Sequence, residues 1–223
     1  MKKYFLVLGL VFIVSCKRAE EPAGLNFYFE NPQPILDSEL TRFPIKFQGL
    51  FMNSDSVFLN IKENVILKES FFKHKFHNKD MDSLKNEFDY LQGKYIIKST
   101  NEIFDFRQLT DSIELFTKKI DTFFIFSNSQ KAKRINGYLV LNTKDSIYWR
   151  IKLINLKKNI LKIKYIYSED DLKRLDSLTK LKSKMIDSTN YILTPSRREF
   201  KSILDLKHLG EDKQYKKVPK SKI

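Results

Sequence analysis

The side chains that could bind a metal ion are concentrated in one short stretch of the chain. His74 and His77 are followed by Asp80 and Asp82, and zinc accepts imidazole and carboxylate ligands. On a helix, His74 and His77 would share one face and could hold the same ion, whereas on a strand they point to opposite faces. The alternation of aromatic residues around His74 favours a strand. We therefore predict surface histidines and no metal site.

Other groups that could support catalysis are scarce. The 223 residues include only six Gly, three His and one Cys, which excludes a Gly-rich phosphate loop, a disulfide framework and a multi-Cys zinc site. No Ser lies in a nucleophile-elbow pattern, and the acidic pair Glu20–Glu21 lies close to the N-terminus. We predict a protein that is not an enzyme, with no catalytic residue and no cofactor.

Cys16 is the residue for which the sequence predicts a defined chemistry. Lys2 and Lys3 precede an apolar stretch, residues 4–14, that is too short to span a bilayer as a stable helix. Residues 13–16 read IVSC, which resembles a bacterial lipobox: apolar residues, a small residue at the cleavage step and a cysteine whose thiol is acylated. We predict a signal peptide over residues 1–15 and a lipid attached to Cys16, so that the protein is a palmitate-bearing lipoprotein.

The residues after Cys16 indicate to which membrane the lipoprotein is transported. Lys17 stands next to the cysteine, where an Asp would resemble an inner-membrane retention signal, and Glu20 and Glu21 follow closely. A Lys followed by acidic residues resembles the export tag of Bacteroidota surface lipoproteins. We predict an outer-membrane protein and leave open whether it faces the periplasm or the cell surface.

The positive charge is explained by composition. The chain carries 41 basic and 27 acidic residues, a net charge of +14 that falls to +12 once Lys2 and Lys3 are removed with the signal peptide. Of the basic residues 33 are Lys, while nucleic-acid readers depend on Arg for bidentate contacts. The lysines are also interspersed with acids. We predict no nucleic-acid partner; the predicted partners are the membrane and, at the envelope, a protein or an anionic glycan.

Apolar residues alternate along most of residues 45–167, with turns on Asn, Asp and Ser at short spacing, which predicts an antiparallel β-meander. From Ser168 the period changes: acids open a predicted helix with Leu172, Leu175, Leu178 and Leu181 on one face. Ser196 and Glu199 form a capping box at the start of a second helix, which we expect to end at Gly210. The predicted fold class is mainly β (α+β), a sandwich or barrel-like body with two C-terminal helices.

Five segments follow from these patterns. They are the signal peptide (1–15), a lipid-anchored tether containing several Pro (16–43), the β-rich body (44–167), a helical part packed on the body (168–212) and a basic tail (213–223). Within the body, residues 49–68 and 137–164 share a weak repeat of Gly, strand, Asp-Ser turn, strand, turn and strand. A duplication and the ordinary self-similarity of a meander both explain it.

Several short stretches resemble landmarks of one protein family. They are FENPQP at 29–34, DSEL at 37–40, QGLF at 48–51, NSDS at 53–56, GYLVLN at 137–142 and PSRREF at 195–200. In these the chain is similar to an uncharacterised family of small flavobacterial lipoproteins over nearly its whole length. The resemblance implies a localisation and an architecture, and no chemistry.

Three functions remain open at this point. The first, which we favour, is a lipid-anchored binding or structural module of the envelope. The second is an immunity or inhibitor lipoprotein that masks a toxin or an enzyme, which an exposed apolar patch would favour. The third is a small envelope hydrolase, which a concave polar pocket with perturbed titratable groups would favour.

Overall fold

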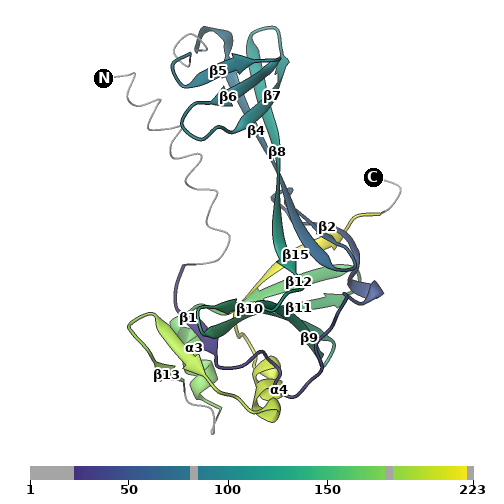
Figure 1. Cartoon of the computed structure of the whole chain (residues 1–223), viewed down its shortest axis with the longest axis vertical. Helices are drawn as coiled ribbons and strands as arrows, with labels where there is room; N and C mark the ends of the chain where they lie inside the picture. Colours follow the sequence, from purple (N-terminus) through teal and green to yellow (C-terminus); the bar gives the residue numbers. More distant parts are fainter. Residues whose placement is uncertain (1–22, 81–84, 179–182, 220–223) are drawn as a thin grey trace. The chain divides into compact units, whose positions relative to one another are not determined.

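The computed structural model describes residues 23–80, 85–178 and 183–219. Within these ranges the protein is mainly β, with a large antiparallel sheet and short helices, as the alternation predicted. The described residues form two compact units. The smaller contains residues 69–121, and the larger contains residues up to Lys68 and from Thr122 onward. The chain passes from the larger unit to the smaller along β4 (Val65–His77) and returns along β8 (Ser112–Ile125) (Figure 1).

The larger unit contains most of the strands and the helices. Its strands are β1 (Asn26–Phe29), β2 (Gly49–Met52), β3 (Phe58–Ile61), β9 (Gln130–Ile135), β10 (Tyr138–Asp145), β11 (Tyr148–Lys157), β12 (Ile160–Tyr165), β13 (Lys184–Met185), β14 (Asn190–Leu193) and β15 (Glu211–Lys217). Its helices are η1 (Ile45–Phe47), α3 (Glu169–Asp176) and α4 (Arg197–Asp205). The hydrogen-bonded order is β13-β14-β1-β11-β12-β15-β2-β3-β4, and β9 and β10 extend from the other edge of β11.

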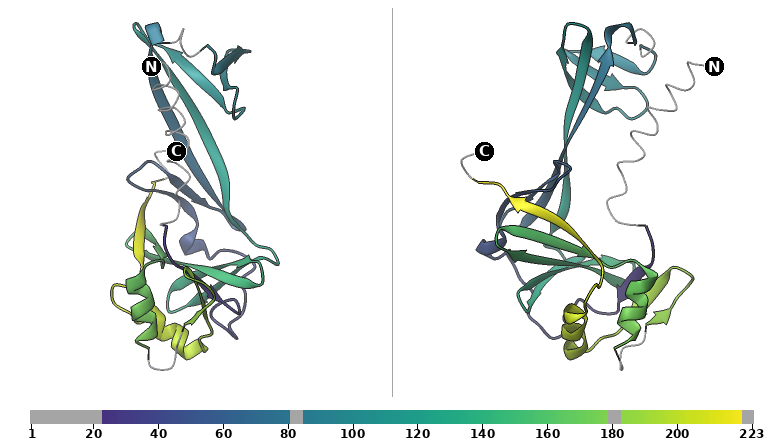
Figure 2. Two further views of the ribbon diagram at one scale, coloured as in Figure 1. Left: turned by 90° about the vertical axis from the view of Figure 1, so that its left-hand side faces the viewer. Right: turned by 180° about the vertical axis from the view of Figure 1, so that it is seen from behind.

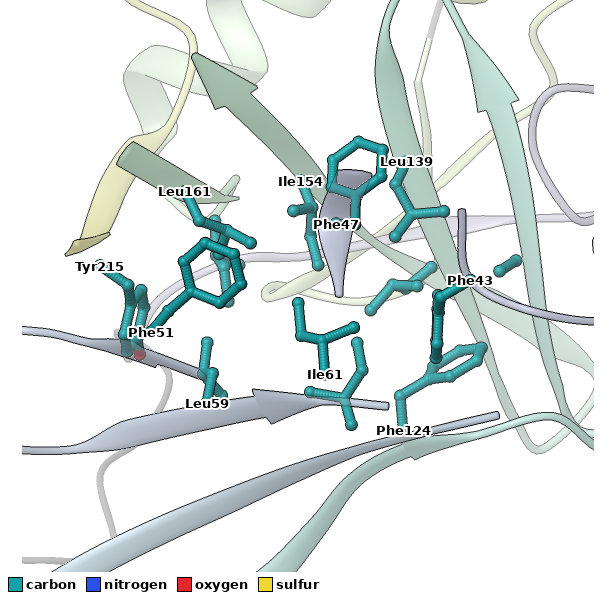
Figure 3. Close-up of a cluster of buried hydrophobic side chains, with 14 residues drawn as sticks. Phe43, Phe47, Phe51, Leu59, Ile61, Phe124, Leu139, Ile154, Leu161 and Tyr215 are labelled. Carbon is teal, nitrogen blue, oxygen red and sulfur yellow. The ribbon is translucent and has the colours of Figure 1, made fainter. Parts of the chain in front are cut away.

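Two hydrophobic clusters hold the larger unit together. In one, shown in Figure 3, side chains of β2 and β3 meet side chains of β10, β11, β12 and β15, so that one part of the sheet packs against another. In the other, Leu175 of α3 and Phe200 and Ile203 of α4 pack with Phe29 and Trp149 of the sheet. Both helices therefore cover the same region of the sheet (Figure 2).

The two helices begin where the sequence predicted. The Ser168 side chain accepts a hydrogen bond from the Asp171 backbone, and the Asp171 carboxylate accepts one from the Ser168 backbone; Ser196 and Glu199 form the same reciprocal box. Both helices are shorter than predicted. α3 ends at Asp176, before Leu178, and Leu181 lies outside the described residues; α4 ends at Asp205, before Gly210. Leu178 still packs against the core after α3 has ended.

Residues 26–43 differ from the predicted tether. β1 pairs in parallel with β14 and contacts β11 at Phe29, and Phe27, Phe29 and Phe43 are buried. The intervening loop is fixed by Asn142, whose side chain accepts from the Gln33 backbone (2.6 Å) and donates to the Gln33 carbonyl (2.8 Å). The Pro residues of this segment lie in a packed loop. Burial of its Phe side chains stabilises the folded segment more than its Pro-containing sequence favours an extended tether.

The predicted basic tail also differs in the structure. Residues 211–217 form β15, which lies between β12 and β2 and pairs with both. Tyr215 is buried in the cluster of Figure 3, while its neighbours Gln214 and Lys216 are exposed. The strand forms because its backbone N–H and C=O groups hydrogen-bond to the open edges of β12 and β2. The polar sequence EDKQYKK alone gives no sign of these partners.

The two segments of the weak repeat have the same element order. Residues 49–68 form β2, β3 and the start of β4, and residues 137–164 form β10, β11 and β12. In each segment the three strands are consecutive neighbours in the sheet. The shared order agrees with either origin of the repeat.

The smaller unit is a sheet with its own core. Beside β4 and β8 it contains β5 (Phe88–Leu91), β6 (Lys94–Ile97) and β7 (Ile103–Gln108), in the order β4-β8-β7-β6-β5. Its core contains Phe76, Phe88, Ile97, Ile113 and Leu115. No helix in the described ranges is long and apolar enough to cross a membrane.

Candidate functional site

A pocket of about 270 Å³ opens in the larger unit where two strands leave the same edge of β11. β1 pairs with β11 at Phe29 and Trp149, and β12 pairs with it from Leu153 onward. In this register residues 150–152 of β11 have neither strand beside them. The gap between β1 and β12 is the pocket, and the paired end of β10 bounds it on the other side.

The far wall of the pocket is closed by the backbone. The Leu25 N–H donates to the Tyr167 carbonyl at 2.6 Å, which joins the start of β1 to the segment that follows β12. Gly24 allows this approach, because a Cβ at this position would collide with the same carbonyl. Asp171 fixes the Tyr167 segment from behind by accepting the Tyr167 N–H at 3.0 Å.

The residues that line this pocket include Lys144 from β10 and Arg150 and Lys152 from β11, and the pairing of Lys144 with Trp149 turns the Lys144 side chain to the other face of the sheet. Residues two apart on a strand point to the same face, so Arg150 and Lys152 stand side by side. Both are half-buried, and among the described residues of the lining Asp145 is the acidic one. Partial burial strengthens the attraction of a cation for an anion relative to that of a fully exposed lysine.

Aromatic rings support two of the three cations. The Lys152 Nζ lies 5.2 Å from the centroid of the Phe123 ring, and the Lys144 Nζ lies 6.0 Å from that of Trp149. Cation–π contacts of this length orient an ammonium group while leaving its protons able to donate to another partner. The two rings therefore help to fix where the ammonium groups of Lys144 and Lys152 lie.

Tyr28 and Asp145 form a hydrogen-bonded pair beside the cations. The Tyr28 hydroxyl donates to the Asp145 carboxylate at 3.3 Å, and its ring contacts that of Tyr148. Burial, followed by the nearby negative charge of Asp145, raises the pKa of the Tyr28 phenol. The phenol therefore stays protonated at neutral pH and acts as a donor, not as a base.

The structure separates the histidine pair, as the predicted strand requires. His74 and His77 both lie on β4; His74 packs its ring against Phe76 at 4.4 Å, and the His77 Nδ1 lies 3.9 Å from the Asp111 carboxylate. Asp82 lies outside the described residues. Among the residues that the structure describes, no group of three or more His, Cys, Asp or Glu side chains is placed to hold a metal ion.

Cys16 and the predicted signal peptide lie outside the described residues, so the acylation site stays a prediction from sequence. The pocket, in contrast, was not predicted. The available signal was the alternation Arg150, Ile151, Lys152 in a strand that otherwise faces a core on both sides. What could not be read from the chain was that β1 and β12 separate at this point.

Comparisons with protein-family models, with curated proteins and with solved structures find no match for this chain.

Proposed function

We propose that this protein is a lipid-anchored, non-catalytic binding module of the bacterial cell envelope that holds an anionic group in the pocket beside β11. The observation that carries the binding role is that Arg150 and Lys152, both half-buried, lie side by side in the lining of one pocket. Cationic side chains that are partly withdrawn from water recognise phosphate or carboxylate groups more strongly than exposed ones do.

The anchor and the location rest on the residues around the N-terminus. The lipobox-like IVSC at 13–16 supports acylation of Cys16, and the residues that follow support the outer membrane, at its periplasmic face or at the cell surface. Several acyl chains, each methylene worth about 0.8 kcal/mol, hold a protein at a bilayer permanently. The resemblance to flavobacterial lipoproteins supports the same location.

A binding role fits the pocket better than hydrolysis does. A hydrolase needs a nucleophile or a general base with a suitable pKa. Tyr167 lines this pocket and Tyr28 lies beside it, and the pKa of each phenol is raised, which opposes a role as base. The cations are suited to hold charge, and Asp145 is engaged by the Tyr28 hydroxyl.

The inhibitor alternative is favoured by a different observation in the smaller unit. Tyr90, Leu91 and Ile103 expose 60%, 59% and 52% of their surface. The centroid of the Tyr90 ring lies 5.1 Å from that of Tyr95 in a tilted contact, which helps to hold the Tyr90 ring in place. Ordered, exposed apolar side chains are typical of protein-binding surfaces. In this alternative, Tyr90→Ser would abolish capture of a protein partner from envelope extract.

The binding role can be tested on a phosphate-ester resin with the full chain in neutral detergent. We expect Arg150→Gln/Lys152→Gln to elute at clearly lower salt than the parent protein. Lys157→Gln/Lys158→Gln removes the same charge from the exposed end of β11 and the turn that follows it, so this variant should elute close to the parent. Equal losses in the two variants would show that net charge alone causes retention, and the pocket would have no binding role.

The anchor needs a separate test. Cys16→Ala should accumulate as unprocessed precursor and lose palmitate labelling, whereas Ser15→Ala, which keeps a small residue before the cysteine, should be processed and labelled normally. Labelling of the Cys16→Ala protein would contradict the proposed anchor.

A further inference from the structure

The chain between β1 and η1 crosses β10 and β9 and is held there mainly by polar contacts. We call residues 31–40 the strap. Phe29, just before it, and Leu40, at its end, pack against the hydrophobic clusters of the larger unit, whereas none of the described side chains in those clusters comes from residues 31–39. Hydrogen bonds and ion pairs therefore hold the middle of the strap on the sheet.

The first of these contacts is a buried cation. Lys133 of β9 is only 6% exposed, and its Nζ donates to the carbonyls of Pro32 (3.2 Å) and Pro34 (2.9 Å). Both partners are uncharged groups of the strap. Burial of a charge without a counter-charge is costly, so the contact stabilises the closed strap less than an ion pair at this place would.

Two ion pairs hold the second half of the strap. The Lys131 Nζ lies 2.7 Å from the Glu39 carboxylate, and Arg197 donates to both oxygens of Asp37, with its Nη2 at 3.0 Å from Oδ2. Lys131 and Lys133 are two residues apart on β9, so they point to one face of the sheet. α4, which begins at Arg197, packs on that same face. The strap thus covers three cationic side chains with its own carbonyls and carboxylates.

Asn142 restricts what could take the place of the strap. Its Oδ1 accepts the Gln33 N–H at 2.6 Å, and its Nδ2 donates to the Gln33 carbonyl at 2.8 Å. These two bonds recognise a peptide group, because a phosphate or sulfate group has no N–H to offer. A replacement needs carboxylates for the cations and a peptide backbone for Asn142. An acidic, extended protein segment provides both.

Two features of the strap favour its opening. The Gln33 Oε1 is buried and has no hydrogen-bond partner among the residues that the structure describes. Leu36 has a left-handed backbone, with φ +65°, and exposes 93% of its surface. An unsatisfied buried acceptor and a left-handed non-Gly residue both raise the free energy of the closed strap.

We infer that the strap is a lid over a cationic surface formed by Lys131, Lys133 and Arg197, and that this surface, once uncovered, binds an acidic, extended segment of a partner protein. In the closed state the strap acts as an internal competitor. The surface lies on the face of the sheet that carries Trp149, and Arg150 of the pocket points to the opposite face. The inference therefore does not depend on the anion-binding role of the pocket.

Opening can be tested by hydrogen exchange of the full chain in neutral detergent. The Gln33 amide should exchange faster than the paired amides of β11, because opening the strap costs less than unfolding the sheet. Asp37→Asn/Glu39→Gln removes both ion pairs of the strap and should speed exchange at Gln33 at least about fivefold, with β11 unchanged. Asp170→Asn removes an exposed carboxylate that pairs with Lys173 and should leave exchange at Gln33 unchanged.

Binding can be tested with a fluorescent peptide of residues 30–41 (ENPQPILDSELT), followed by its anisotropy. The Asp37→Asn/Glu39→Gln chain should bind this peptide at least about fivefold more tightly than the parent chain, since its own strap competes less. Adding Arg197→Gln should weaken binding about tenfold, because a two-point ion pair is lost. Adding Arg198→Gln, which removes the same charge from the next, exposed residue of α4, should change binding less than about twofold.

Four results would overturn the inference. Exchange at Gln33 no faster than in β11 would show that the strap is not a lid. Equal binding of a peptide with Asn and Gln at positions 37 and 39, or equal weakening by the two Arg variants, would remove the cations from recognition. Tighter binding of a sulfated glycan chain would assign the surface to a polyanion. The resin experiment above uses variants on the other face of the sheet, so a failure of the pocket can be told from a failure of the strap.

Discussion

Asp171 joins three parts of the larger unit, and its removal tests this connection directly. Its carboxylate accepts backbone hydrogen bonds from Tyr167 (3.0 Å), Ser168 (3.0 Å) and Gly210 (2.6 Å). The side chain is only 2% exposed although it is charged. It therefore connects the far wall of the pocket, the first turn of α3 and the entry to β15.

The magnitude follows from these contacts. A hydrogen bond to a charged group contributes about 1.5–3 kcal/mol, and half-buried donors recover part of the loss by binding water. We expect Asp171→Ala to lower the free energy of unfolding of the larger unit by about 3–5 kcal/mol. The neighbouring Asp170→Ala is the matched control: it removes an exposed carboxylate whose contact is Lys173, so it should cost about 0.5 kcal/mol or less.

Urea unfolding followed by the fluorescence of Trp149 measures this difference, because Trp149 is the one Trp of the chain and is buried in the larger unit. With a slope of about 2 kcal/mol per molar, the midpoint should fall by about 1.5–2.5 M for Asp171→Ala. A shift no larger than that of Asp170→Ala would refute the role assigned to this carboxylate.

The difference in the free energy of unfolding between the parent protein and Asp171→Ala should also depend on pH, and the pKa of Asp171 fixes its direction. Burial alone would raise the pKa of Asp171, but the backbone hydrogen bonds from Gly210, Ser168 and Tyr167 outweigh it and lower the pKa below 3.8. A depressed folded-state pKa contributes stability that is complete above the ordinary value and is lost as the pH falls through the folded value. The gap between the parent protein and Asp171→Ala should be full at pH 7 and should narrow below about pH 4; a gap that widens in acid would contradict this.

Three further predictions concern the larger unit. Gly210→Ala should destabilise it by more than about 3 kcal/mol in urea unfolding, because Gly210 has φ +64° and its new Cβ would collide with a neighbouring backbone carbonyl. The control Gly137→Ala, at a position with φ +80° and open space, should cost about 1 kcal/mol. Asn142→Ala should cost about 3 kcal/mol by the same measurement, because it strips a fully buried side chain from the loop it fixes, while the exposed Asn128→Ala should leave the midpoint unchanged. Asp145→Asn should raise the salt concentration needed to elute the full chain from the phosphate-ester resin, because it removes a carboxylate from the pocket lining; elution at lower salt would show that Asp145 contacts the anion favourably.

Features that depend on local sequence were predictable. Alternating apolar residues indicated the strands because side-chain direction on a strand repeats every two residues. The two capping boxes, at Ser168 and Ser196, marked the helix starts because the interaction is closed within four residues. The separation of His74 and His77 followed from the same alternation.

Features that depend on distant strands were not predictable. The Pro-containing segment before Phe43 resembled a tether, although the spacing of its Phe residues was a signal of burial. β15 has one buried aromatic, Tyr215, and forms because two other strands leave a place for it. The pocket arises from the register of β1 and β12 on β11, and no local pattern encodes the point where two strands diverge.

The position of β15 in the chain determines which of the two units can finish folding first during synthesis. The smaller unit is one continuous stretch of chain, so it has all its strands soon after residue 121 has been made. The larger unit cannot join β12 to β2 until residues 211–217 are present. A chain that stops before Glu211 would expose two unpaired strand edges, which promote aggregation and attack by proteases. The late position of β15 in the chain thus makes the larger unit sensitive to incomplete synthesis.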